Sequence, residues 1–165
     1  MRYLTKILVL AACLIALSGV AAACTCGTNE CKSPGYWKNH ADSWSKVFCL
    51  NEKGVFIEKD WYPVDKAVDY MSEPVKGDKT YTLFKAVVAA KLNVRNGCCE
   101  DKQIESTISN ASKWLYEHKV GSGVRANSEA WQGWYDQCGQ WHEGGEYYYE
   151  ILDAYNNGRY TCSSC

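Results

Sequence analysis

Three residues near the C-terminus, His142, Glu143 and Glu146, carry acid–base side chains close together in the sequence. A histidine with two carboxylates is a set that a glycan hydrolase or a metal site uses. The two carboxylates of a glycosidase flank a cleft, however, and sequence neighbours rarely do so. The intervening Gly144–Gly145 is more typical of a link between helices, with Glu146 favouring the next N-terminus. We therefore expect no catalytic residue and a protein that is not an enzyme.

The cysteines are the other chemically active group. Cys162 and Cys165 have the two-residue gap of a zinc knuckle, which Cys24, Cys26 and Cys31 could complete. The gaps are irregular, and disulfides are favoured in an exported chain. The sequence contains no haem-attachment motif, no His-Glu-x-x-His, no EF-hand loop and no glycine-rich phosphate loop. We expect no metal and no cofactor.

The first 23 residues have the composition of a secretory signal peptide. Arg2 and Lys6 give a positive start, residues 7–17 are apolar, and Ala21–Ala23 offer small residues to a signal peptidase. The alternative is an uncleaved anchor helix at the lower limit of length. The sequence therefore predicts an extracellular or cell-surface location.

Export makes disulfides the expected state of the cysteines after residue 24. We expect at least three disulfides, with the adjacent Cys98 and Cys99 each paired elsewhere because bridging neighbours strains the geometry. Cys24 is the odd one, a candidate for lipidation or for an interchain bridge. The candidates for disulfides are Cys26, Cys31, Cys49, Cys98, Cys99, Cys138, Cys162 and Cys165.

The overall composition is that of a globular domain. Of 165 residues, 47% are hydrophobic and 22% charged, and 18 basic against 19 acidic residues give a net charge of −1. The hydrophobic content excludes a disordered chain. The lack of a basic excess argues against nucleic acid as a partner.

Apolar spacing predicts helices along most of the chain. The first is expected to start at Ser33–Pro34 and to carry Trp37, Ala41, Trp44 and Phe48 on one face. A short strand or hairpin is expected around residues 55–57. Five further helices are expected: Pro63 to before Pro74, Asp78 to Asn96, Asp101 to His118, Trp131 to Cys138, and around Tyr148–Tyr155.

The helix expected from Asp78 to Asn96 has the broadest apolar face, which includes Leu83, Phe84 and Val87, and is expected to be central. The helix expected from Asp101 to His118 carries Asn110 in the sequon Asn110-Ala111-Ser112, a candidate for N-glycosylation on its outer face. The fold class that follows is all-α: a compact, disulfide-stapled bundle of about five or six short helices, with at most one small β-hairpin.

The segment Cys31-Lys-Ser-Pro-Gly-Tyr-Trp-Lys-Asn-His40, with Trp44 after it, resembles the Cys-x-x-x-Gly-Tyr-Trp-Lys-Asn-His module of many secreted bacterial and archaeal surface proteins. The likeness continues in Pro74–Asp78, Ala89–Gly97 and the Trp114–Leu115 helix. It implies an extracellular module attached to surface or anchoring segments, and it implies no catalytic activity. We divide the chain into the signal peptide 1–23, this helical module at 24–120 and an aromatic C-terminal helical extension at 121–165.

The motif itself has two interpretations. Its aromatic and polar side chains suit binding, but Trp37 shares a predicted helix face with Trp44, which favours an architectural role. Lys38 and Asn39 face away from that helix side and are the better candidates for contact.

The C-terminal extension has more aromatic residues than a small segment can bury. Trp131 and Trp134 are expected in the core because they share one helix face. Trp141 and the run Tyr147, Tyr148 and Tyr149 are expected at the surface, since three adjacent residues point in three directions. Exposed aromatic rings stack on sugars or fill subunit interfaces.

The function that the sequence predicts is contact without catalysis, as in a surface-layer, fibre or adhesion component. The alternatives are a glycan-binding module and, less favoured, a glycan-directed hydrolase. The expected partners are other surface proteins or copies of the same chain, and glycans under the first alternative. No nucleic-acid partner is expected, and membrane contact would require a lipid on Cys24 or the uncleaved signal anchor.

Overall fold

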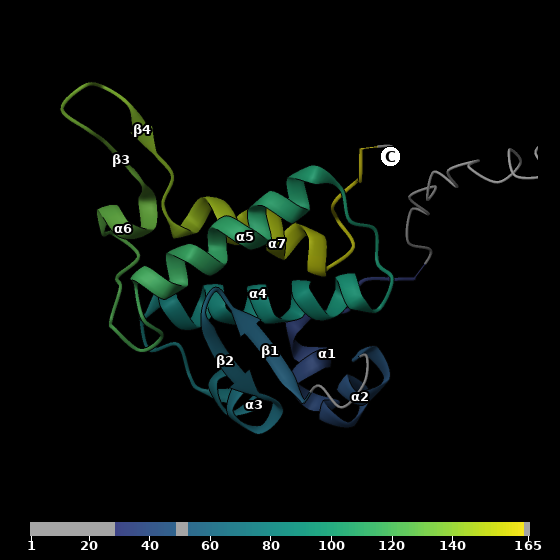
Figure 1. The fold of residues 1–165 in the computed structure, drawn as a ribbon. Helices are drawn as coiled ribbons and strands as arrows, with labels where there is room; N and C mark the ends of the chain where they lie inside the picture. Colours follow the sequence, from purple (N-terminus) through teal and green to yellow (C-terminus); the bar gives the residue numbers. More distant parts are fainter. Residues whose placement is uncertain (1–28, 49–52, 164–165) are drawn as a thin grey trace, which may run out of the picture.

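The computed structural model describes residues 29–48 and 53–163. Within these ranges the chain forms seven α-helices, one short 3-10 helix and two antiparallel strand pairs. Three helices are long: α4 (Lys79–Arg95), α5 (Lys102–Glu117) and α7 (Gly145–Asn156). Figure 1 shows α5 and α7 on one side of α4 and the N-terminal elements on the other. The fold is therefore mostly helical, with α4 as its middle layer.

The central position of α4 explains its composition. Leu83, Phe84 and Val87 are fully buried, as are residues on the adjoining faces, because helices cover α4 from two sides. Asp78 caps the start by accepting hydrogen bonds from the backbone N–H and the hydroxyl of Thr80, at 3.0 and 2.7 Å. Gly97, with φ of 79°, follows its end. The predicted central helix is confirmed.

The N-terminal region is broken where the sequence predicts one continuous helix. It forms α1 (Pro34–Asn39), the 3-10 turn η1 (Ala41–Ser43) and α2 (Trp44–Val47). The break lies at His40, whose φ of −126° and ψ of 55° leave the helical region. Trp37 and Trp44 are buried as expected, but the break leaves Ala41 exposed.

The predicted hairpin and the next three helices are confirmed. Strand β1 (Gly54–Ile57) pairs antiparallel with β2 (Asp60–Pro63), and α3 (Val64–Ser72) follows and ends before Pro74. Helix α5 begins at the expected N-cap Asp101, whose carboxylate accepts the Ile104 N–H at 2.9 Å. Helices α3, α4 and α5 all lie within the ranges that the apolar spacing indicates.

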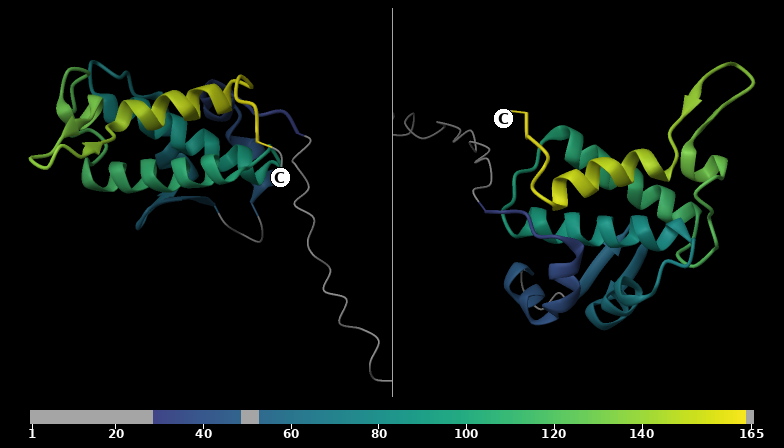
Figure 2. Two further views of the ribbon diagram at one scale, coloured as in Figure 1. Left: turned by 90° about the horizontal axis from the view of Figure 1, so that it is seen from above. Right: turned by 180° about the vertical axis from the view of Figure 1, so that it is seen from behind.

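The predicted helix from Trp131 to Cys138 is wrong beyond Gln132. Helix α6 covers only Glu129–Gln132, and the chain then forms a second antiparallel pair, β3 (Trp134–Tyr135) and β4 (Trp141–His142). Gly133 ends the helix with φ of 93°, a conformation that glycine adopts without strain. Residues 133–143, which we call the arm, project beyond the helices (Figures 1 and 2). The fold is consequently not purely all-α.

Two disulfides join the described cysteines, Cys31 to Cys98 and Cys99 to Cys162, with Cα–Cα distances of 5.3 and 6.6 Å. The adjacent cysteines thus pair elsewhere, as expected. The prediction of a disulfide at Cys138 is wrong. Its thiol is free and exposed, because Cys138 lies in the turn of the arm instead of on a packed helix. Cys24, Cys26, Cys49 and Cys165 lie outside the described residues, and so does the predicted signal peptide. In the described part, no helix has the length and apolarity needed to cross a membrane.

Candidate functional site

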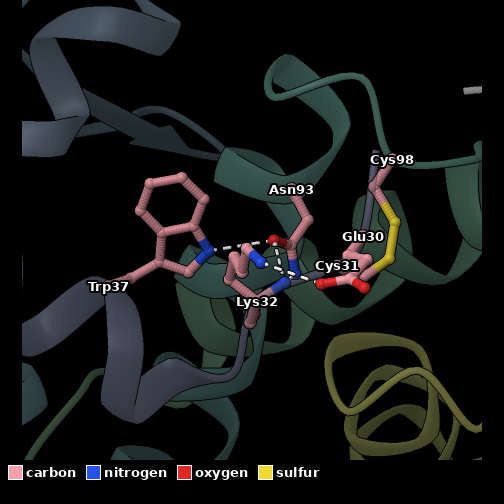
Figure 3. A network of polar contacts seen from close by, with 6 residues as sticks. All are labelled: Glu30, Cys31, Lys32, Trp37, Asn93 and Cys98. Atoms are coloured by element: carbon pink, nitrogen blue, oxygen red, sulfur yellow. Dashed lines mark hydrogen bonds and ion pairs between the residues drawn. A yellow bond between two sulfur atoms is a disulfide. The ribbon is translucent and has the colours of Figure 1, made fainter. Parts of the chain in front are cut away.

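The motif around Trp37 has a structural explanation centred on Asn93 of α4. The buried Asn93 carbonyl oxygen accepts hydrogen bonds from the Trp37 indole N–H at 2.9 Å and from the Lys32 backbone N–H at 2.8 Å. Its amide nitrogen donates to the Lys32 carbonyl, at 2.9 Å. Figure 3 shows these contacts beside the Cys31–Cys98 disulfide. Asn93 therefore holds both the Lys32 backbone and the Trp37 side chain on α4.

The same amide reaches the C-terminal helix. Asn93 also donates to the side-chain oxygen of Asn156, at 2.9 Å, and Asn156 in turn donates to the Ala86 carbonyl, at 2.9 Å. Both asparagines are fully buried. This network links the N-terminal segment, α4 and α7, and sequence reasoning missed both amides. The signal that could have revealed Asn93 in the sequence was a single asparagine among the apolar residues of α4.

Lys38 and Asn39, the contact candidates of the motif, lie at the end of α1. Lys38 is half-buried and Asn39 is exposed. Helix α1 lies on the opposite side of α4 from the arm (Figure 1). The structure therefore does not bring these two residues together with the aromatic candidates of the C-terminal extension.

The arm carries its aromatic side chains on two faces. Trp134 pairs with His142 in the strand register, and their rings stack at a centroid distance of 4.6 Å. Tyr135 pairs with Trp141 on the other face, at 4.9 Å. Trp134 and Trp141 are each 44% exposed and Tyr135 is 70% exposed. The surface prediction for Trp141 is confirmed, whereas the core prediction for Trp134 is wrong because the helix that would have buried it ends at Gly133.

The turn of the arm is ordered by Asp136. Its carboxylate accepts the backbone N–H groups of Gln140 and Cys138, at 2.8 and 2.9 Å, and lies 3.2 Å from His142 Nε2. The hydrogen bond from Gln140, followed by that from His142, lowers the pKa of the Asp136 carboxyl.

The two ends of the arm join the bundle beside two tryptophans, Trp114 and Trp131, and we call this junction the root of the arm. Trp131 of α6 is fully buried, and the Trp114 indole of α5 donates to the Ala130 carbonyl at 2.9 Å. The chain returns from the arm through Gly145, where a Cβ atom would lie 2.8 Å from the Trp131 ring and 2.9 Å from the Trp114 ring. Only glycine fits between these rings, so both ends of the arm are fixed to the bundle. The core prediction for Trp131 is confirmed.

A cavity of about 270 Å³ lies where the arm meets the bundle. It joins His142 and Glu143 of the sequence analysis with Tyr148 of α7. Of the α5 residues in its lining, sequence reasoning missed Lys113 and Glu117. Burial first, and then the charges of Glu143, Tyr147 and Glu117, raise the pKa of the Tyr148 phenol. The cavity is lined by Asn110, Lys113, Trp114, Glu117, His142, Glu143 and Tyr148.

The tyrosine run is only partly at the surface. Tyr147 is 48% exposed, in agreement with the prediction. Tyr148 and Tyr149 are half-buried, because α7 turns Tyr148 into the cavity and Tyr149 toward Trp131, at a ring distance of 6.0 Å. Asn110 is exposed on α5 as expected for a glycosylation candidate, while the hydroxyl of Ser112 is buried and donates to the Ile108 carbonyl at 2.7 Å.

A larger and more apolar hollow of about 770 Å³ lies between α2 and α3, with Trp44, Phe48 and Val68 in its lining. Phe48 and Lys53 both border it, and the chain between them lies outside the described residues. We assign no role to this hollow. Across residues 29–48 and 53–163, no group of three or more histidine, cysteine or acidic side chains is placed to hold a metal ion.

The fold and the site together define a disulfide-linked helical bundle with a projecting aromatic arm. No protein-family model, no curated protein and no solved structure matches the chain. The likeness of residues 31–116 to the secreted surface module therefore remains an expectation from the sequence.

Proposed function

We propose that the protein is a non-catalytic extracellular or cell-surface component that acts by protein–protein contact. The contact is made by the face of the arm that carries Tyr135 and Trp141, which we call its outer face. The observation that carries this proposal is the exposure of Tyr135 and Trp141 on a hairpin held away from the helices. Interface cores are enriched in tyrosine and tryptophan, and such rings dominate binding energies.

The arm is short and is held in place from the bundle. Strands β3 and β4 have two residues each, and a two-stranded hairpin of this kind is marginally stable in water by itself. The fixed root and the Asp136 turn hold the backbone in place without covering the outer rings. Because the arm is ordered in advance, a partner would bury Tyr135 and Trp141 at a small entropic penalty. A second copy of the chain is the partner that we test.

The test is sedimentation velocity of the purified protein from micromolar to near-millimolar concentration. We expect concentration-dependent association that the double variant Tyr135→Ser, Trp141→Ser abolishes. Trp61→Ser is the matched control, because Trp61 is an exposed aromatic residue of β2, outside the arm. A wild-type protein that stays monomeric over the whole range, or a double variant that associates as the wild type does, would overturn the proposal.

A further inference from the structure

The cavity at the root of the arm is built from three separate elements. Helix α5 contributes one stripe at helical spacing: Asn110, Lys113, Trp114 and Glu117. The end of the arm contributes His142 and Glu143, and the first turns of α7 contribute Tyr148. Because tryptophan rings fix the root, the three walls are held in one arrangement without a ligand.

The polar groups of this cavity include both donors and acceptors. Lys113, the Asn110 amide and the Tyr148 phenol donate, and the raised pKa of Tyr148 keeps that phenol protonated. The carboxylates of Glu117 and Glu143 accept. Hydroxyl groups, which donate and accept at once, match such a mixture.

Other classes of ligand fit the same walls less well. An apolar ligand would take these polar groups out of water without pairing them. An anion would meet two carboxylates against one ammonium. A small cation would pair with the carboxylates but would leave the donors Asn110, Lys113 and Tyr148 without acceptors. A volume of about 270 Å³ lies just below the range of sites for drug-sized molecules, which favours a single ring over an extended ligand.

We infer that this cavity binds one uncharged pyranose ring of a glycan, with Lys113, Glu117, Glu143 and Tyr148 as its hydrogen-bonding partners. The aromatic wall of the cavity is Trp114, and His142, another lining residue, stacks on the partly exposed Trp134 ring. The site is distinct from the outer face of Tyr135 and Trp141 and does not depend on the proposed self-association.

The experiment is saturation-transfer NMR and calorimetric titration of the intact purified protein with methyl glycosides of glucose, galactose, mannose and N-acetylglucosamine. Butylammonium serves as the cationic comparison. We expect saturable binding of at least one glycoside, weakened about tenfold or more by Glu143→Gln and by Tyr148→Phe. Lys113→Gln, at an exposed position, should weaken binding too without endangering the fold. Glu150→Gln, an exposed change on the same helix as Tyr148, should leave the affinity unchanged.

Three results would overturn the inference: no glycoside saturating at tens of millimolar, binding that Glu143→Gln and Lys113→Gln leave intact, or butylammonium binding more tightly than every glycoside. Its failure is distinguishable from failure of the proposed function, since the double variant at Tyr135 and Trp141 is scored by sedimentation and the cavity variants by glycoside affinity. Hydrolysis of a bound oligosaccharide would uphold the cavity as a sugar site and overturn the non-catalytic proposal.

Discussion

Replacing Asn93 by alanine should be among the most destabilising single changes in this protein. The side chain is fully buried and takes part in four hydrogen bonds, with Lys32 twice, Trp37 and Asn156. Alanine fills none of these roles. The Trp37 indole N–H and the Asn156 side-chain oxygen would remain buried without a partner, since both lie in the core.

The magnitude follows from those two orphaned groups. Each unsatisfied buried polar group costs about 1–3 kcal/mol, so Asn93→Ala should lower the free energy of unfolding by about 2–6 kcal/mol. That is a large share of the total stability of an ordinary domain, about 5–15 kcal/mol. Urea denaturation followed by circular dichroism and tryptophan fluorescence measures the change.

Two further variants make the test specific. Asn39→Ala, at an exposed position of α1, should change stability by no more than about 0.5 kcal/mol. Trp37→Phe removes the orphaned N–H, so it should be less destabilising in the Asn93→Ala background than in the wild type. A loss below about 1 kcal/mol for Asn93→Ala, or full additivity with Trp37→Phe, would refute the reasoning.

Four other predictions concern the rest of the molecule. Burial acts to raise the pKa of Asp101, but hydrogen bonds from Ile104, Tyr160 and Ser163 lower it from 3.8 to about 2. The ionised Asp101 carboxylate therefore stabilises the fold fully at pH values above its ordinary pKa of 3.8. That stabilisation is lost as the pH falls through the lowered pKa of about 2. Asp101→Asn should flatten this acid dependence in urea midpoints. Leu83→Ala should destabilise the protein by about 2–4 kcal/mol in the same assay, and a loss below about 0.5 kcal/mol would contradict a central α4. Gly145→Ala should lower the melting temperature by calorimetry, because its Cβ would lie 2.8 Å from the Trp131 ring; an unchanged value would mean that the root is loose. Cys138→Ser should remove one thiol titratable in the unreduced native protein, and an unchanged count would show that Cys138 is bonded.

The helices could be predicted where local signals agree with one another. In α4, the Asp78 cap, the apolar faces and the Asn96–Gly97 stop all indicate the same boundaries, and the structure keeps them. In the first predicted helix the apolar spacing continued across His40, but the backbone leaves the helical region there. Spacing alone does not reveal such a break.

The arm shows a stronger limit of the same method. Trp131, Trp134, Tyr135 and Cys138 follow one another at helical intervals, yet only Trp131 lies in a helix. Gly133 was the local signal that the pattern stops. A conformation with φ of 93° depends on the hairpin that follows, and hairpin pairing is a contact that a period of three or four residues does not report.

The cavity depends on contacts that are distant in sequence. The proximity of His142 and Glu143 in the sequence drew attention to them, although the sequence favoured a link between helices there. Lys113 and Glu117 join them only because α5 packs beside the root of the arm, where the Trp114 indole donates to the Ala130 carbonyl. Nothing in the α5 sequence distinguishes these two charges from an ordinary solvated helix face.

The two disulfides also determine how the molecule would respond to being pulled by its ends. Tension entering at Cys31 passes across one disulfide to Cys98, through a single peptide bond to Cys99, and across the other disulfide to Cys162. Residues 32–97 and 100–161 lie in two closed covalent loops beside that short path. A stretching force between the termini would therefore bypass the bundle and leave the arm and its cavity folded, and reduction of the disulfides would expose both loops to the force.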